Sequence, residues 1–323
     1  MTGFLRAIPM LRTTCMVPAL LLAAMTTVRT AAAQQVADSA FVAHTGAPRW
    51  KAGEGPLLVL DEAHHNFHTL DGRYLTFGRM ATGIGFRVQP LRRQFSDEAL
   101  RNVSVLVIAN ALNERNGSGN WTLPTPSAFD AAEIAAVVRF VEQGGGLLLV
   151  ADHMPFAGAA EQLGRALGVQ FVNGFAFASP EKDAESVLVY RRSSGLRSPL
   201  IGAGTVDSIV AFTGSAFRLL RGGVPLMTLP RASHIWLPKT AWVFGDTVPS
   251  IQGEDWLQGA ALSIGKGRVV VLGEAAMLSA QRAGAQRAPM GMNEPRAQQN
   301  ALYAAQLLRW LAGEGRAIAP SRE

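Results

Sequence analysis

The chain has 323 residues, of which 48% are apolar and 17% charged, and its formal net charge is +6. This length and composition can bury one large core or two smaller ones. The basic residues form no blocks with interleaved aromatic residues, so we infer no nucleic-acid partner. The single cysteine, Cys15, lies in a predicted leader. The mature chain would therefore lack disulfides, thiolate nucleophiles and cysteine metal ligands.

Residues 1–33 are predicted to be a secretory signal peptide. Arg6 and Arg12 make the start basic, residues 16–25 are apolar, and the triplet AAA at 31–33 precedes the expected cleavage site. The apolar run is about half of the roughly 20 residues that a membrane-spanning helix needs. An uncleaved anchor is the alternative. We expect a periplasmic or secreted protein with a net charge of +3 and no stable membrane span after cleavage.

Residues 34–54 are small and polar without a period, so they are predicted to form a tether. An alternation of apolar strands and helices begins at residue 55. Continuous apolar runs indicate strands that are buried on both faces, and the alternation indicates a parallel sheet with helices on both sides. The predicted strands are 57–60, 85–88, 103–109 and 147–151, and the predicted helices are 73–84, 96–100, 131–143 and 157–167.

The stretch 176–265 has short apolar segments separated by Gly, Pro and Ser, which predicts an antiparallel β-rich insertion or lobe. Its predicted strands are 187–190, 206–212, 224–229 and 241–244. Residues 268–272 are predicted to return to the parallel sheet, and an amphipathic helix at 298–312 follows. The expected organisation is a signal peptide (1–33), a tether (34–54), an α/β domain (55–175 with 266–313) and a β-rich insertion (176–265).

Acidic and imidazole side chains follow three of the predicted strands. Ligands of an open parallel sheet bind outside the carboxyl ends of its strands, where the loops converge. We therefore expect these side chains to meet in one crevice if the strands are neighbours. The candidate catalytic residues are Asp61, His64, Asp152, His153 and Glu274.

Three chemistries are open to this set. Carboxylate and imidazole groups suit Zn, Mn or Mg, and the same groups can act as acid and base without a metal. The third alternative is structural, because such residues also cap helices and bind loop backbone. The segment HHNFH lacks the HExxH spacing of a zinc site. The candidate metal ligands are His64, His65, Asp152 and His153.

Four tryptophans lie in loop-like or β-rich stretches: Trp121, Trp236, Trp242 and Trp256. Exposed aromatic rings there could stack on sugar rings, and burial in the core is the commoner alternative.

Three segments, LLVLDEAHHN, VSVLVIANAL and FVEQGGGLLLVADHMPFAGAAEQLGRALG, resemble the class I glutamine amidotransferase-like superfamily. The likeness is closest to exported bacterial members related to the domain of intraflagellar transport proteins and sugar-transport operons. It covers residues 55–175 and 266–312 and implies a flavodoxin-like doubly wound fold. The family's nucleophilic cysteine follows a strand, whereas the matching turn here reads Asp152-His153-Met154-Pro155. Glutamine hydrolysis by a thiolate is therefore not expected, and the fold alone assigns no function.

Two functions follow as predictions. The first is a binding or scaffold module for a sugar, a cell-wall fragment or a protein partner. The alternative is a hydrolase that uses a divalent metal (Zn, Mn or Mg) or acid–base chemistry at the strand ends. The expected ligand of the site is a small molecule or a carbohydrate. The sequence assigns neither the identity of a cofactor nor an oligomeric state.

Overall fold

The computed structural model describes residues 35–181, 187–197, 200 and 206–318, so the predicted signal peptide lies outside the described residues. By its contacts the chain divides into Met1–Ala32 and Ala33–Glu323, and the fold below is that of the second unit. In the described part of the chain, every helix is too short or too polar to cross a bilayer.

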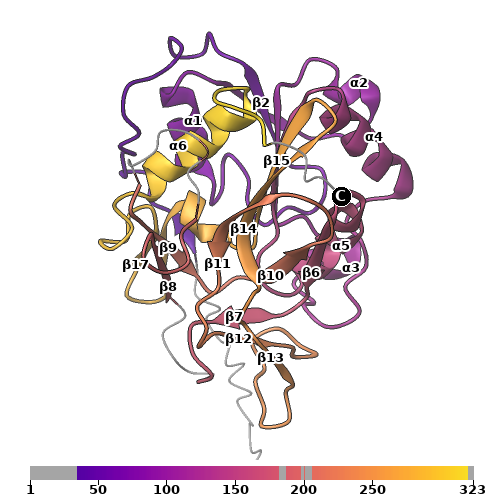
Figure 1. The fold of residues 1–323 in the computed structure, drawn as a ribbon, viewed down its shortest axis with the longest axis vertical. Helices are drawn as coiled ribbons and strands as arrows, with labels where there is room; N and C mark the ends of the chain where they lie inside the picture. Colours follow the sequence, from indigo (N-terminus) through magenta and orange to yellow (C-terminus); the bar gives the residue numbers. More distant parts are fainter. Residues whose placement is uncertain (1–34, 182–186, 198–199, 201–205, 319–323) are drawn as a thin grey trace, which may run out of the picture. The chain divides into compact units, whose positions relative to one another are not determined.

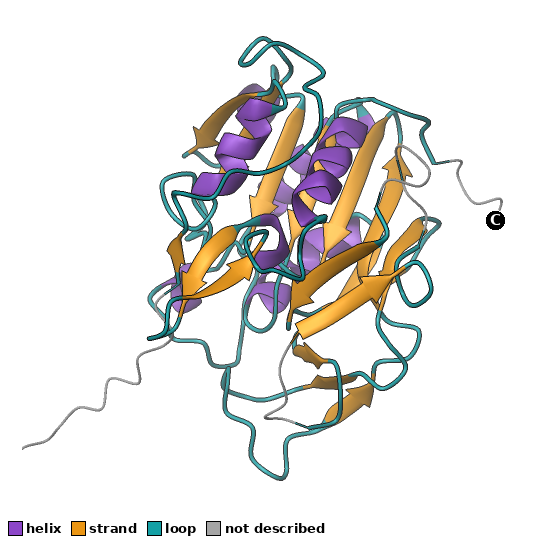
Figure 2. Cartoon of the chain, turned by 90° about the vertical axis from the view of Figure 1, so that its left-hand side faces the viewer, coloured by secondary structure: helices purple, strands orange, loops and turns teal. Residues whose placement is uncertain are grey.

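The molecule is a mixed α/β protein built on one large sheet (Figures 1 and 2). Its strands run in the order β3-β2-β4-β5-β15-β14-β10-β6, and β11 also pairs with β14. The first five strands are parallel, and the remaining pairs are antiparallel. The parallel strands are β2 (Leu57–Asp61), β3 (Arg87–Leu91), β4 (Val105–Ala109), β5 (Gly146–Val150) and β15 (Gly267–Leu272). The others are β6 (Val169–Val172), β10 (Ala216–Leu219), β11 (Val224–Thr228) and β14 (Leu257–Ile264).

Smaller antiparallel sheets surround the main one. One joins β1 (Val36–Ala37), β16 (Ala280–Ala283) and β17 (Ala288–Gly291). A second joins β7 (Phe175–Phe177), β12 (His234–Trp236) and β13 (Ser250–Gln252), and a third pairs β8 (Val187–Arg191) with β9 (Ser208–Phe212). The segment predicted as a β-rich insertion thus contributes strands both to the main sheet and to small sheets.

Helices cover both faces of the parallel strands (Figure 1). On one face, α1 (Leu75–Gly83) and α6 (Asn300–Leu311) pack through Phe77 and Leu307 onto residues such as Leu58. On the other face, α4 (Ala131–Glu142) and α5 (Phe156–Ala166) pack through Val137 and Leu163. The short helices are α2 (Asp97–Leu100), α3 (Glu114–Gly117) and the 3-10 turn Ala276–Leu278. The apolar runs predicted as buried strands are therefore enclosed on both sides, as parallel sheets require.

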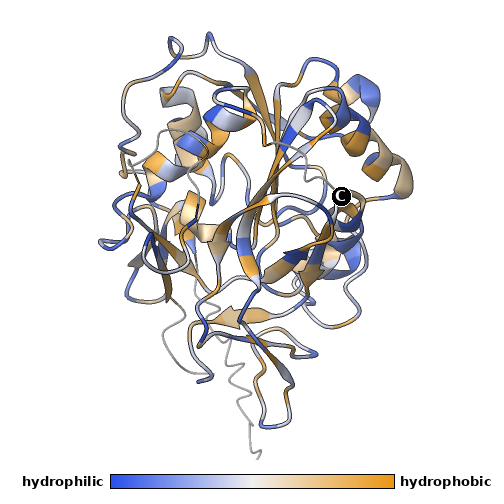
Figure 3. Cartoon of the chain, in the orientation of Figure 1, coloured by the Kyte–Doolittle hydropathy of each residue, from blue (hydrophilic) through white to orange (hydrophobic). Residues whose placement is uncertain are grey.

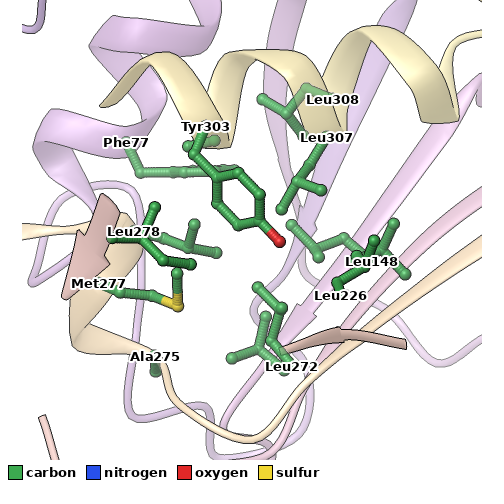
Figure 4. Packing of buried hydrophobic residues seen from close by; sticks show 14 of the residues in the cluster. Phe77, Leu148, Leu226, Leu272, Ala275, Met277, Leu278, Tyr303, Leu307 and Leu308 are labelled. Carbon is green, nitrogen blue, oxygen red and sulfur yellow. The ribbon is translucent and has the colours of Figure 1, made fainter. Parts of the chain in front are cut away.

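Hydropathy follows this layering. The central strands are largely hydrophobic, while the helices carry hydrophilic residues among hydrophobic ones (Figure 3). Figure 4 shows the core between α6 and the sheet, where Tyr303 lies among Leu148, Leu226 and Leu272. Burial raises the pKa of Tyr303 above its usual range, so its phenol stays neutral.

The edge strand β3 contains a proline. The N–H of Arg87 donates to Pro56 O at 3.1 Å, and Leu91 O accepts from Glu62 N at 2.9 Å, so both residues face β2. Alternate residues of a strand direct their backbone groups to opposite sides, so the backbone groups of Pro90 point away from β2. The missing N–H of Pro90 therefore costs no hydrogen bond within the sheet.

The capping of α4 fixes the position of the Glu133 side chain. Asp130 accepts from the backbone N–H of Glu133 at 2.8 Å, and the Glu133 carboxylate accepts from the N–H of Asp130 at 3.1 Å. This reciprocal pair is a capping box, and it holds the Glu133 side chain at the first turn of the helix.

The predicted parallel strands and long helices are all observed, with ends displaced by up to three residues. Two local predictions differ from the structure. The segment 34–54 is not a loose tether where it is described, because β1 pairs with β16 and Trp50 packs on Phe86 at 5.1 Å between ring centroids. Residues 241–244 are a loop and not a strand, because Trp242 has a positive φ of 65°.

Candidate functional site

Four polar residues stand at the carboxyl ends of neighbouring parallel strands. Asp61 ends β2, Asn110 follows β4, Asp152 lies two residues after β5, and Glu274 lies two residues after β15. These strands are adjacent in the sheet, and Ala109, Val150 and Leu272 lie in register. The ends of these strands therefore lie at one edge of the sheet. All four side chains are buried.

The His64 imidazole uses both ring nitrogens in contacts with carboxylates. Nδ1 lies 2.8 Å from Asp61 Oδ1, and Nε2 lies 2.8 Å from Glu133 Oε1. The ring is packed between Phe95 and Phe129 at centroid distances of 4.6 and 4.9 Å. His64 thus joins the end of β2 to the first turn of α4.

The protonated state of His64 is favoured by this environment. Burial acts to lower the pKa of His64, but hydrogen bonds and charges from Asp61 and Glu133 outweigh it, and the pKa is raised above 6.5. A protonated imidazole can donate from both nitrogens, one to each carboxylate. We interpret the group as a buried ionic link with no ring nitrogen left for a substrate.

Asp152 and Glu274 form a second group. Glu274 accepts from the N–H groups of Ala276 and Met277 at 2.5 and 2.8 Å. Asp152 Oδ1 accepts from His153 N at 2.7 Å, and the N–H of Asp152 donates to Asn110 Oδ1 at 2.9 Å. Burial and the nearby charge of Asp152 raise the pKa of Glu274 well above its usual range. By accepting two backbone N–H groups, the Glu274 carboxyl group holds the turn after β15.

His153 lies at the centre of a cluster of aromatic rings. Its Nδ1 donates to Met154 O at 2.6 Å, which leaves the lone pair of the neutral ring on Nε2. The ring stacks on Phe175 with centroids 4.5 Å apart and an interplanar angle of 12°. Trp242 meets it edge-on at 4.8 Å, and Trp121 lies at 6.1 Å. We call Phe67, Trp121, His153, Phe175 and Trp242 the aromatic group.

The exposed side of the aromatic group lies on two loops, residues 121–123 and 239–242, which backbone hydrogen bonds join to each other. Thr122 forms an isolated bridge with Thr240, the N–H of Leu123 donates to Lys239 O, and the N–H of Ala241 donates to Trp121 O, both at 2.9 Å. Trp242 is 49% exposed, and Leu123 is 47% exposed. Large exposed apolar side chains on neighbouring loops are typical of a binding surface.

Three polar side chains behind the aromatic group have atoms without partners among the described residues. His68 is 2% exposed and neither ring nitrogen has a hydrogen bond; Asn110 is 1% exposed and its Nδ2 has none. The Nε of Arg73 is likewise buried without a partner. Buried polar atoms are rarely left unpaired, so these atoms indicate a place for a ligand or water.

The four predicted metal ligands are not brought together. Both nitrogens of His64 contact carboxylates, and His65 is exposed with a positive φ of 45°. Asp152 and His153 belong to the second group of side chains. Within the residues that the structure describes, no three His, Cys, Asp or Glu side chains are placed to hold a metal ion. The geometry therefore gives no support to a shared metal site, because adjacent histidines in this loop point to different surroundings.

Sequence reasoning missed several residues of the site, among them Glu133 and Arg73. Glu133, the partner of His64, is 69 positions away in the chain, although the pattern Asp130-x-x-Glu133 is a capping-box signal. Arg73 was predicted only as the start of a helix. No sequence signal indicated that its guanidinium would lie 3.7 Å from the Phe67 ring centroid.

A pocket of about 730 Å³ lies at the opposite, amino end of the strands. Its lining includes Arg268, whose guanidinium already donates to the carbonyl oxygens of Trp310 and Glu314 at 2.7 and 2.6 Å. The C-terminal ends of α4 and α6 border the pocket, and their free carbonyls disfavour an anion there. We therefore place the candidate site at the carboxyl edge.

No family model and no curated protein matches the chain. Among solved structures it is similar to the mmIFT52 N-terminal domain, with 14% identity, a TM-score of 0.55, and coverage of 81% of this chain and all of that one. Its structural neighbours also include a ThuA-like protein from Bacteroides uniformis, with 15% identity, a TM-score of 0.40, and coverage of 85% and 96%. Another is a ThuA-like protein from Parabacteroides merdae, with 9% identity, a TM-score of 0.38, and coverage of 83% and 91%. The last two TM-scores are below 0.5, so the likeness in fold rests on the first structure.

Proposed function

We propose that the chain is an exported, amidotransferase-like domain with a flavodoxin-like doubly wound core. In chain order, the parallel strands stand in the sheet as second, first, third, fourth and fifth, which is the flavodoxin-like order. The likeness in fold to the mmIFT52 N-terminal domain supports this proposal. The basic and apolar start of the sequence supports export.

We propose that this domain binds a carbohydrate at the aromatic group and does not hydrolyse it. The observation that carries the proposal is the half-exposed Trp242, which is supported from behind by His153 and Phe175. A half-exposed ring held by two neighbouring rings suits contact with an apolar sugar face at little cost in conformational entropy.

The geometry does not favour the hydrolase alternative, because the residues predicted to act as acid and base are bound to other groups of the protein. Asp61 and His64 are occupied by each other and by Glu133, and the Glu274 oxygens accept backbone N–H groups. General acid–base catalysis needs groups within hydrogen-bond reach of the substrate. Among the predicted catalytic residues, only His153 has a ring nitrogen near the aromatic surface that no described side chain or backbone group occupies. One imidazole without an acidic partner is a poor basis for hydrolysis.

The proposal is tested by binding measurements on the chain without residues 1–33. A glycan array identifies oligosaccharide ligands, and calorimetry then measures their affinity. Trp242→Ala is expected to weaken binding at least tenfold, whereas Trp242→Phe keeps an aromatic face and loses less. Leu220→Ala, which removes a comparably exposed apolar side chain elsewhere, serves as the matched control and should not change affinity.

Two results would contradict the proposal. One is the absence of any glycan ligand for a folded wild-type chain. The other is glycan binding that Trp242→Ala leaves unchanged. Thermal melting of each variant, monitored by circular dichroism, separates lost binding from lost folding.

A further inference from the structure

Arg73 carries a charge without a counter-charge. Its Nη1 donates to Phe67 O at 3.1 Å, and the guanidinium lies over the Phe67 ring. Among the described residues no carboxylate lies within ion-pair distance of it, and burial lowers the pKa of Arg73. A partly desolvated guanidinium without a partner is costly, so it favours an incoming anion.

The unoccupied edge of Arg73 has a definite chemistry. With Nη1 used by a carbonyl, the Nε edge remains, and Nε has no partner. The two parallel N–H groups of a guanidinium edge match the two oxygens of a carboxylate. A hydroxyl group of a neutral sugar would use this edge less well and would leave the charge unpaired.

His68 and Asn110 place further unpaired groups nearby. The His68 ring lies 5.5 Å from the Phe67 ring that Arg73 covers, and the N–H of Phe67 donates to Asn110 O at 3.0 Å. Burial, with smaller contributions from the charges of Arg73 and His153, lowers the pKa of His68 to about 3. His68 is therefore neutral at pH 7 and offers one donor and one acceptor. Asn110 adds two donors through its unpaired Nδ2.

The aromatic group connects this place to the exposed surface. Phe67 lies 5.4 Å from Trp121, Trp121 lies 6.1 Å from His153, and His153 lies 4.8 Å from Trp242, all between ring centroids. Phe67, Trp121, His153 and Trp242 thus form a continuous chain of ring contacts from Arg73 to the exposed Trp242.

We propose that Arg73, with His68 and Asn110, forms a subsite for a carboxylate, so that the ligand is an acidic oligosaccharide containing uronic acid. This inference rests on the proposed carbohydrate-binding function and names the class of sugar. The carboxylate occupies the Arg73 end of this chain of ring contacts, and the sugar faces contact the aromatic group toward Trp242.

The test compares each acidic oligosaccharide with its own methyl ester. Galacturonate and glucuronate oligosaccharides and their methyl esters are titrated into the chain without residues 1–33. The wild type is expected to bind the acid at least tenfold more tightly than the ester. Arg73→Gln should remove this preference by weakening binding of the acid at least tenfold, and Arg73→Lys should keep part of it. Arg93→Gln, an exposed arginine on another loop, is the matched control and should keep the full preference.

The outcomes separate the two proposals. Equal binding of acid and ester by the wild type overturns the carboxylate subsite and leaves the carbohydrate-binding function standing. A preference for the acid that Arg73→Gln retains overturns the assignment of Arg73. If the folded wild type binds no glycan at all, the proposed function itself is overturned. If Arg73→Gln does not fold, the acid–ester comparison on wild type and Arg73→Lys still decides.

Discussion

His64 and His68 lie four residues apart in the loop after β2, both are buried, and their surroundings are opposite. Both ring nitrogens of His64 contact carboxylates, whereas neither nitrogen of His68 has a partner among the described residues. The pKa of His64 is raised, and burial lowers that of His68 to about 3. The comparison shows that residue type and burial do not separate a structural histidine from one available to a ligand. The hydrogen-bond partners separate them.

The largest effect is expected from breaking the His64 link. His64→Ala leaves Asp61 and Glu133 as buried carboxylates without their cation, so the free energy of unfolding should fall by about 3–5 kcal/mol. Urea unfolding at pH 6 measures it. The pKa of His64 is higher in the folded than in the unfolded state, so its contribution is complete below about pH 6.5 and is lost as the pH rises through the folded-state pKa. The deficit of the variant should therefore shrink at high pH.

His65→Asn is the matched control for this prediction. His65 is exposed, and asparagine tolerates its left-handed backbone conformation. Its unfolding free energy should stay within about 0.5 kcal/mol of the wild type. A similar loss in both variants would show that the loop, and not the ionic link, carries the stability.

The second effect concerns His68 and has the opposite dependence on pH. Because the folded-state pKa is about 3 and the unfolded value about 6.5, the unfolded chain alone takes up a proton as the pH falls between them. The wild type should lose stability over this window, and His68→Phe should not. Relative to their difference at pH 8, the variant should gain about 2–3 kcal/mol at pH 4.5. Parallel stability curves for the two proteins would show that His68 is already paired or hydrated.

The smallest effect is expected at the cap of α4. Asp130→Ala removes one side-chain bond to the first turn and should cost about 1 kcal/mol, measured by urea unfolding. Ser96→Ala, which removes the equivalent cap of the four-residue helix α2, gives the comparison. A loss at Asp130 as large as that of His64→Ala would mean that the cap holds the ionic link in place.

The sequence predicted the part of the site that depends on strand order. Apolar runs followed by Asp61, Asp152 and Glu274 identify the ends of buried strands, and the alternation with helices makes those strands parallel. The carboxyl ends of neighbouring parallel strands then lie at one edge of the sheet. This expectation needs no knowledge of which distant residues touch.

The partners within the site could not be predicted in this way. Glu133 reaches His64 from a helix that comes 69 residues later, and Phe175 reaches His153 from a short antiparallel strand. Such contacts depend on how loops and helices pack across the sheet, which hydrophobic periodicity does not encode. The prediction of a strand at 241–244 failed for a related reason. In this loop Phe244 packs on Phe175, and Trp242 has a left-handed conformation.

The outward-facing Pro90 of β3 has a consequence for contacts between molecules. An exposed strand edge offers hydrogen bonds through which another polypeptide can add itself to the sheet. On this side of the sheet, the backbone nitrogen of Pro90 has no hydrogen to donate, and the positively charged Arg92 and Arg93 follow two and three residues later. The exposed edge of β3 is thus protected against pairing with the edge strand of another molecule, which is the first step of aggregation through sheet edges.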